Sequence, residues 1–166
     1  MGWGEDFRCK KCGWIQTVFL GYGNRYPEMY QIADSMIRTG KCGKEWKELY
    51  ESIPGAAVNA AKQLHVCTNP ECRAFHTKLD LSIYRPNDPN TSKIHTKPYS
   101  AECPATDVEY AAPYELHQSY TLVKTYSHKC PDCGSPMRHY KEGDKLKCTG
   151  CGEPAMDYIP SMHMWR

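Results

Sequence analysis

The most regular alternation of hydrophobic and polar residues covers residues 75–84. One side of the alternation is hydrophobic apart from a threonine: Phe75, Thr77, Leu79, Leu81 and Ile83. Because successive side chains of a strand point to opposite faces of a sheet, the pattern predicts an antiparallel strand with one face toward water. Shorter patterns predict strands over 15–22 and 120–128, and a hairpin over 137–147 that turns at Gly143-Asp144.

Residues 27–62 have a helical pattern instead. A first helix is expected to begin near Pro27 and end near Gly40, since its apolar residues recur at intervals of three and four: Met29, Ile32, Ala33, Met36 and Ile37. A second helix is expected over 43–52, and its apolar residues also share one face: Trp46, Leu49, Tyr50 and Ile53. Pro54 prevents its continuation. The alanine-rich run 56–62 predicts a third, short helix.

Residues 85–115 lack either period and contain five prolines. Proline fixes the backbone and removes a donor, so this segment is interpreted as a linker or an extended arm. Three tyrosines in it indicate that it lies on another surface: Tyr99, Tyr110 and Tyr114.

Eight of the ten cysteines fall in four short pairs, here called hooks. The first hook is Cys9/Cys12, the second Cys67/Cys72, the third Cys130/Cys133 and the fourth Cys148/Cys151. Two residues between cysteines allow both thiolates to reach one metal ion, and the glycine after three of the hooks permits the positive φ of that turn. A two-residue gap closes a disulfide only with strain, so the spacing favours zinc over a disulfide framework and a reducing compartment over a secreted protein.

Pairing the hooks in sequence order gives two complete sites of four cysteines. The third and fourth hooks are separated by fourteen residues, close to the spacing of a zinc ribbon, and are expected to share one zinc ion. The first and second hooks, 54 residues apart, would share another. A crossed pairing of the hooks remains an alternative, as does iron, although iron-binding hooks of the rubredoxin kind are spaced more widely.

These patterns predict a small α+β protein with two zinc-ribbon-like modules of four cysteines each, the first with a helical insertion. Residues 1–84 form the N-terminal zinc module, with the insertion over about 27–62, and residues 85–115 form the linker or arm. Residues 116–166 form the C-terminal zinc ribbon. Both zinc ions would be structural, and zinc would stabilise strands that are too few to form a large core.

The second hook, Cys67-Thr-Asn-Pro-Glu-Cys72-Arg-Ala-Phe, resembles two families of zinc finger. A similar Cys-x-Asn-Pro-x-Cys hook follows a Cys-x-x-Cys-Gly hook in phage late-gene activators of the Ogr/Delta type. The C-terminal fingers of bacterial type IA topoisomerases carry a comparable Pro-Glu-Cys-Arg hook. The resemblance covers residues 9–13 and 67–75 and implies the geometry of a zinc finger. Because both families bind DNA, it also implies nucleic acid as a candidate partner. Neither family has the long helical insertion.

The whole chain is similar to uncharacterised bacterial proteins that begin with a Trp-Gly-x-Asp-Phe-x-Cys-x-x-Cys-Gly stretch and end in a zinc ribbon. This resemblance implies an architecture of two ribbons and no particular activity.

The overall charge does not favour a dedicated DNA-binding domain. The formal net charge of the 166 residues is +2, and the pI is about 8.0, whereas such domains usually exceed a pI of about 9. Positive residues do lie beside the hooks, and these are the candidate nucleic-acid contacts: Lys10, Lys11, Arg73, Lys78, Lys141, Lys145 and Lys147. Acidic residues on the same segments favour a solvated surface instead.

No segment indicates a signal peptide or a membrane span, which predicts a cytoplasmic protein. Cys42 and Cys103 lie outside the hooks. Lys41 and Lys44 would lower the pKa of an exposed Cys42 thiol and make it reactive. The favoured interpretation of both cysteines is an ordinary small side chain without a chemical role. His65 and His128 each lie two residues before a hook and suit a position behind the metal ligands. Met162-His163-Met164 resembles a soft-metal motif but favours a frayed tail.

Two functions fit the sequence. The first is a structural-zinc module or adaptor that binds a protein partner, through the helices of Trp46 and Tyr50 or through the aromatic loop. The second is a nucleic-acid-binding regulator that acts through the hooks. Catalysis is not expected, because four thiolates leave no open position on the metal and the chain has no nucleophile or phosphate-binding motif and no evident small-molecule substrate. A zinc or redox sensor is a further alternative, since oxidised thiols release metal.

Overall fold

The computed structural model describes residues 2–96 and 108–165, which form two compact units. Unit 1 consists of residues 1–21, 62–78 and 127–166, and unit 2 of residues 22–61 and 79–126. The small α+β class is confirmed: the described residues hold three helices and a larger number of strands. The sequence predicts three consecutive segments divided near residues 84 and 115, whereas both compact units are built from separated stretches of chain.

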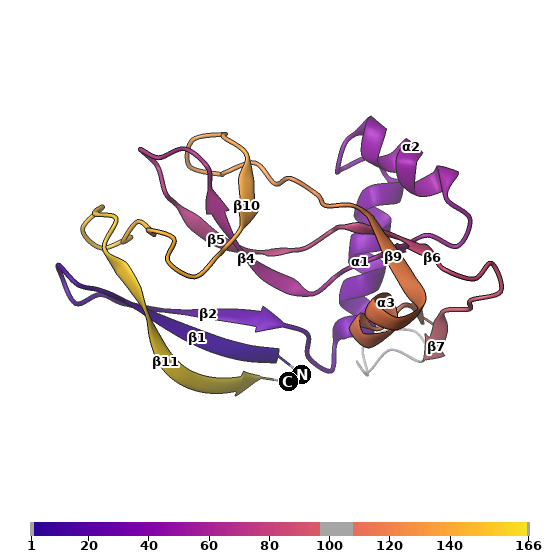
Figure 1. Cartoon of the computed structure of the whole chain (residues 1–166), viewed down its shortest axis with the longest axis horizontal. Helices are drawn as coiled ribbons and strands as arrows, with labels where there is room; N and C mark the ends of the chain where they lie inside the picture. The colour runs from indigo at the N-terminus through magenta and orange to yellow at the C-terminus, as the bar shows by residue number, and fades with distance from the viewer. Residues whose placement is uncertain (1, 97–107, 166) are drawn as a thin grey trace. The chain divides into compact units, whose positions relative to one another are not determined.

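Unit 1 is built on one sheet of six strands (Figure 1). Its strands are β1 (Gly2–Cys9), β2 (Ile15–Gly21), β4 (Lys62–Cys67), β5 (Phe75–Leu79), β10 (Met137–His139) and β11 (Met156–Trp165). They are ordered β10-β4-β2-β1-β11, and β5 also pairs with β4. The first strand therefore lies between the second and the last, with Phe7 opposite Gln16 on one side and Tyr158 on the other.

The hydrophobic side of this sheet is small and includes metal-ligand cysteines. Phe7 is completely buried at its centre, where its ring contacts Phe75, Tyr140 and Tyr158. The buried cluster around it is Phe7, Cys9, Val18, Leu20, Leu64, Val66, Phe75, Leu146, Cys148 and Met156. A second cluster contains Cys67, Cys72, Ala74, Cys130 and Met137.

Unit 2 packs its helices against a separate sheet of three short strands. The helices are α1 (Tyr26–Arg38), α2 (Lys44–Ser52) and α3 (Pro113–Ser119). The sheet is ordered β3 (Ala57–Val58), β6 (Ile83–Pro86) and β9 (Tyr120–Lys124), and β7 (Ile94–Thr96) pairs with β8 (Val108–Tyr110). The first two predicted helices are thus confirmed, with ends within about two residues of those expected.

The core of unit 2 joins large aromatic residues of the helices to small residues of the sheet. Trp46 and Tyr50 are both buried; the Trp46 indole donates to the Leu81 carbonyl at 3.2 Å and the Tyr50 hydroxyl to Asp34 at 2.6 Å. This burial removes both side chains from the surface, and binding of a protein partner through the helices that carry them stays a prediction.

The predicted helix over 56–62 is wrong. Ala57 and Val58 form a strand that pairs with β6, and the backbone N–H groups of Val58 and Ala60 donate to the hydroxyls of Tyr30 and Tyr26, each at 3.4 Å. Small side chains let this extended segment lie against the tyrosines of α1, and that packing outweighs the helix propensity of alanine.

Two predicted strand patterns also differ from the structure. The alternation over 75–84 is interrupted between β5 and β6, where Leu81 has φ = +60° and buried Asp80 accepts hydrogen bonds from Ser82 and Asn59. The hairpin over 137–147 does not form: β10 pairs with β4, while Leu146 bridges to Met156. The predicted arm over 85–115 contains β7, β8 and the start of α3, and its residues 97–107, with Tyr99 and Cys103, lie outside the described residues.

Candidate metal centres

The four hooks share one backbone conformation. In each, the N–H of the first cysteine donates at 2.8 Å to a carbonyl just beyond the second: Cys9 to Trp14, Cys67 to Ala74, Cys130 to Ser135 and Cys148 to Glu153. A second bond closes each turn, from the residue after the second cysteine back to a carbonyl four residues earlier. The hooks are therefore rigid turns that present two thiols on one side.

The residue after the second cysteine has positive φ in every hook. It is +77° at Gly13, +76° at Gly134 and +78° at Gly152, as the glycines predict. In the second hook Arg73 occupies this position with φ = +51°, a conformation that is unfavourable for a side chain with a Cβ. That hook has four residues between its cysteines. Its turn is closed by the Arg73 N–H donating to the Asn69 carbonyl, whereas in the other three hooks the carbonyl of the first cysteine accepts this bond.

The hooks meet first with fourth and second with third. Site A contains Cys9, Cys12, Cys148 and Cys151; site B contains Cys67, Cys72, Cys130 and Cys133. The pairing in sequence order is therefore wrong, although all eight hook cysteines belong to a four-cysteine site.

Strand pairing explains this arrangement. The first hook follows β1 and the fourth precedes β11, and these strands pair with Cys9 opposite Met156. The second hook follows β4 and the third precedes β10, which pair with Cys67 opposite Met137. Each metal site thus lies at the end of an antiparallel strand pair in unit 1.

The sulfur positions fit a tetrahedral metal ion. In a tetrahedron with metal–sulfur bonds of about 2.3 Å, neighbouring sulfurs lie about 3.8 Å apart. The observed Sγ–Sγ distances are Cys9–Cys151 3.7 Å, Cys12–Cys148 3.6 Å, Cys67–Cys133 3.4 Å and Cys72–Cys130 3.8 Å. A disulfide would require about 2.05 Å, so these distances correspond to metal ligands and not to cystines.

Each site combines buried and accessible ligands. Cys9 and Cys148 of site A are buried while Cys12 and Cys151 are exposed; in site B only Cys133 is exposed. The Gly150 N–H lies 3.3 Å from the Cys148 sulfur, in position to stabilise a thiolate. Four protein ligands complete a tetrahedral shell, which is typical of a structural metal and not of a catalytic one.

Hydrogen bonds within the hooks lower the pKa of one thiol in each site. The Cys12 backbone lowers the pKa of the Cys9 thiol to about 7, and the side chain and backbone of Ser135 lower the pKa of Cys133 to about 6. Burial raises the pKa of Cys67 to about 12. Because a thiolate is the form of cysteine that binds metal, the lowered pKa values of Cys9 and Cys133 favour metal binding at both sites.

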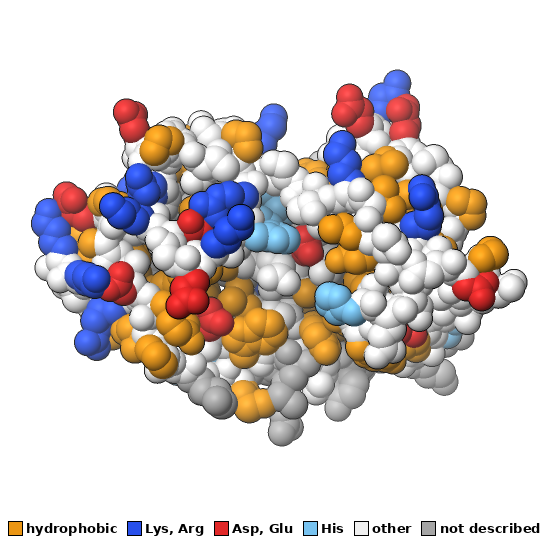
Figure 2. Space-filling view, viewed as in Figure 1, with side chains coloured by type: hydrophobic (Ala, Val, Ile, Leu, Met, Phe, Trp, Pro, Cys, Tyr) orange, Lys and Arg blue, Asp and Glu red, His pale blue; other side chains and the backbone are white. Residues whose placement is uncertain are grey.

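Acidic partners engage several of the candidate nucleic-acid contacts. Lys10 lies 2.6 Å from Asp157 and Lys11 3.1 Å from Glu153. Lys141 contributes only its backbone N–H to Asp144, whose carboxylate also accepts two hydrogen bonds of 2.7 Å from the Arg138 guanidinium. On the face drawn in Figure 2, Lys and Arg side chains lie next to Asp and Glu side chains.

The other candidate nucleic-acid contacts lie in or near the second and fourth hooks. The Lys147 N–H donates to the Arg73 carbonyl at 2.9 Å, which brings the second and fourth hooks together within unit 1. Lys78 is half-buried near the end of β5, and Lys145 is exposed.

Three of the isolated sites named from the sequence lie within the described residues: Cys42, His65 and His163. Cys42 is partly buried, and this burial raises the pKa of its thiol, which opposes the reactivity that neighbouring lysines would confer. His65 is fully buried, and its ring packs edge-to-face against His128 and His139 at centroid distances of 4.7 and 4.8 Å. His163 lies on β11 and contacts Asp6 at 2.9 Å, so the final residues form a strand and not a frayed tail.

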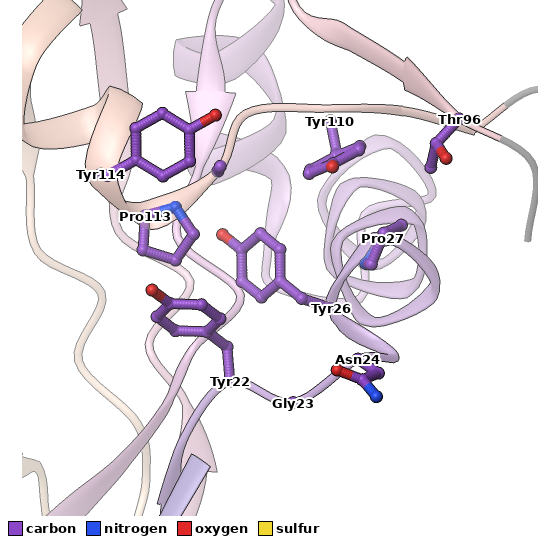
Figure 3. A pocket seen from close by; sticks show the side chains of 10 residues that line it. Tyr22, Gly23, Asn24, Tyr26, Pro27, Thr96, Tyr110, Pro113 and Tyr114 are labelled. Atoms are coloured by element: carbon purple, nitrogen blue, oxygen red, sulfur yellow. The ribbon is translucent and has the colours of Figure 1, made fainter. Parts of the chain in front are cut away.

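Sequence reasoning missed a tyrosine pocket in unit 2. Its cavity volume is about 340 Å³, and ten residues line it: Tyr22, Gly23, Asn24, Tyr26, Pro27, Thr96, Tyr110, Ala112, Pro113 and Tyr114. Figure 3 shows Tyr26 in the middle of this lining, with Tyr22 and Pro113 on one side and Tyr110 and Pro27 on the other. The aromatic loop was the one signal in the sequence, since it supplies Tyr110 and Tyr114.

Among the residues that the structure describes, no helix combines the length and apolar character needed to cross a bilayer. Comparison with protein-family models, curated proteins and solved structures finds no match for this chain.

Proposed function

We propose that this chain is a protein-interaction module in which two structural zinc ions hold unit 1 and the tyrosine pocket of unit 2 binds a proline-containing segment of a partner protein. Zinc is the metal that four thiolates in a closed tetrahedral shell most commonly bind. Thiols kept free for metal suit a reducing compartment, so we place the protein in the cytoplasm.

The composition of the pocket carries this proposal. Four of its ten lining residues are tyrosines, two are prolines and none is charged. Aromatic-lined grooves are the usual recognition surface for proline-rich segments, whose extended backbone is already ordered before binding. An uncharged lining also disfavours a phosphate or nucleic-acid backbone as the occupant.

Internal packing holds the rings of the pocket in place. Tyr26 is buried, accepts the Ala60 N–H through its hydroxyl, and packs edge-to-face on Tyr22 at 5.4 Å and on Tyr110 at 6.1 Å. Burial raises the pKa of both Tyr26 and Tyr110, so their hydroxyls stay protonated. A fixed surface of this kind loses little conformational entropy when a ligand binds.

Outer residues of the pocket supply polar groups for a bound backbone. The Tyr114 side chain is 55% exposed, and Asn24 is also exposed. Hydroxyl and amide donors at these positions would bind the carbonyls of a polyproline II segment, which has no internal hydrogen bonds.

Nucleic-acid binding through the hooks has less support. It requires cations that are available to phosphates, and Lys10 and Lys11 already contact acidic side chains. The resemblance of the second hook to DNA-binding fingers concerns the turn, and the same turn occurs at all four hooks.

The test is a titration of the isotopically labelled full chain with an oligoproline peptide, followed by NMR. The expected result is a set of shifts confined to pocket residues, absent with a glycine–serine peptide of equal length. Tyr114→Ala should abolish them, whereas Tyr158→Ala, which removes an exposed tyrosine of unit 1, should not. Absence of shifts at the pocket, or shifts there with tetramethylammonium and not with oligoproline, would overturn the proposal. Salt-sensitive retention on heparin together with a silent pocket would favour nucleic acid instead.

A further inference from the structure

A third group of metal-ligand side chains lies beside site B. His76 is on β5, Asp132 is between the two cysteines of the third hook, and Cys130 is a ligand of site B. One ligand atom from each lies within 4.8 Å of the other two. The group thus combines nitrogen, oxygen and sulfur donors, a set that suits borderline divalent ions such as Zn²⁺.

The spacing of His76 and Asp132 fits shared coordination. His76 Nε2 and Asp132 Oδ2 lie 3.6 Å apart, too far for a good hydrogen bond. Two ligands at about 2.0–2.1 Å from a tetrahedral zinc ion would lie about 3.4 Å apart. The pair therefore needs almost no movement to bind one ion.

The Nε2 atom of His76 points to the same conclusion. It is buried and has no hydrogen-bond partner among the described residues, although about a third of the His76 side chain is exposed. A buried polar atom without a partner carries a free-energy penalty, which coordination of a metal ion would remove.

A cavity adjoins this group within unit 1. Its volume is about 320 Å³, and both His76 and Asp132 line it, together with Lys147 and Thr149 of the fourth-hook segment. Two of the three candidate ligands thus line a cavity, and zinc sites with three protein ligands keep one position open for water or a small anion. Sites A and B, with four protein ligands each, have no such position.

We propose that His76, Asp132 and Cys130 bind a third divalent cation of the Zn²⁺ or Co²⁺ type. The thiolate of Cys130 bridges this ion and the ion of site B, and the open coordination position faces the cavity. With three protein ligands in place of four, and one of them shared, the third ion binds more weakly than the ions of sites A and B. It is therefore exchangeable under conditions in which those two ions are retained. The site is independent of the tyrosine pocket, which belongs to unit 2.

The test adds Co²⁺ to full chain that carries two zinc ions and counts bound metal by native mass spectrometry, with the visible absorption of Co²⁺ as a second readout. The wild type should bind one Co²⁺ in addition to two Zn²⁺. His76→Gln and Asp132→Ala should bind none at Co²⁺ concentrations that saturate the wild type, and should keep both Zn²⁺. The matched control His95→Gln, which replaces an exposed histidine of unit 2, should behave as the wild type.

Three outcomes would overturn the proposal. One is a wild type that takes up no third ion in excess Co²⁺, and another is a third ion that binds His76→Gln as well as it binds the wild type. The last is loss of a tight Zn²⁺ from His76→Gln, because His76 would then support the Cys130 thiolate of site B by a hydrogen bond. Retention of two Zn²⁺ in each variant reports that unit 1 is folded, so a failure to fold cannot be mistaken for loss of the third site.

Discussion

Units 1 and 2 are of similar size but are stabilised in different ways. Unit 2 has one continuous core of seventeen buried residues, none of which is a metal ligand. Unit 1 has clusters of ten and five buried residues, and five of these fifteen are cysteines of sites A and B. Hydrophobic burial is the main contribution in unit 2, whereas a third of the buried residues in the clusters of unit 1 are thiols that a metal ion would hold apart.

The two four-cysteine sites lie in the unit that is built from strands, and the described helices lie in the unit with the larger hydrophobic core. All eight hook cysteines belong to unit 1, and all three described helices belong to unit 2. Thiols brought together without metal would bury polar groups and, at neutral pH, charge, so sites A and B are unfavourable when empty.

Removal of metal should therefore destabilise unit 1 and leave unit 2 folded. With a strong chelator, amide hydrogen exchange should lose protection throughout β1, β2, β4 and β11 while α1 and β6 stay protected. The metal contribution is large, since structural zinc sites bind with about 10–16 kcal/mol in small domains. Equal loss of protection in both units would show that unit 2 also depends on the metal and would contradict the comparison.

Substitution of a single ligand cysteine should disrupt one metal site and leave the other intact. Cys9→Ser removes a ligand of site A, so Cys12, Cys148 and Cys151 should become alkylated rapidly while the four cysteines of site B stay protected. Mass spectrometry of the alkylated peptides measures both sets at once. Cys42→Ser, which alters neither site, is the control, and rapid alkylation of Cys67 and Cys72 would instead support pairing of the hooks in sequence order.

The smallest expected effects concern the backbone of the hooks. Gly134→Ala places a Cβ at φ = +76° with no atom within 4 Å, so it should destabilise unit 1 by about 1 kcal/mol through conformation alone. Arg73→Gly removes the Cβ that makes the positive φ of the second hook unfavourable, so it should stabilise unit 1. The gain should be less than about 1 kcal/mol, because two effects oppose it. Glycine increases the entropy of the unfolded chain, and the hydrogen bond from Arg73 Nε to the Pro70 carbonyl is lost.

Urea unfolding followed by hydrogen exchange measures these changes unit by unit. Gly40→Ala is the matched control: it has φ = +80° with equally open surroundings but lies in unit 2, so it should leave unit 1 unchanged. A loss of stability in Arg73→Gly would mean that the hydrogen bond of its side chain outweighs the strain.

What the sequence predicted correctly was mostly local. The turn of each hook is encoded by its own cysteines, followed by a glycine in three hooks and by Arg73 in the second. The helices α1 and α2 are encoded by their apolar periods, so all of these local features were predicted. The partners of the hooks depend on strand pairs between distant segments, such as Cys9 with Met156, and hook spacing carries no information about them. For that reason the eight ligands were identified but their pairing was not.

The other differences have physical causes that a single sequence hides. Ala57 and Ala60 have a high helix propensity, but their small size serves contact with the tyrosines of α1. The strand breaks between β5 and β6, but Leu81 is buried there in spite of its positive φ. The alternation of hydrophobic and polar residues therefore continues through the break and hides it in the sequence. The tyrosine pocket and the His76 group assemble from segments that no motif connects.

The nested order of the hooks also sets when each site can close during synthesis. The fourth hook, which completes site A, and the third hook, which completes site B, both follow residue 126, where the last segment of unit 2 ends. The ribosome thus makes every residue of unit 2 before either ion can gain its full set of ligands. The first hook waits longest for its partner, because the 135 residues between Cys12 and Cys148 are translated in the interval.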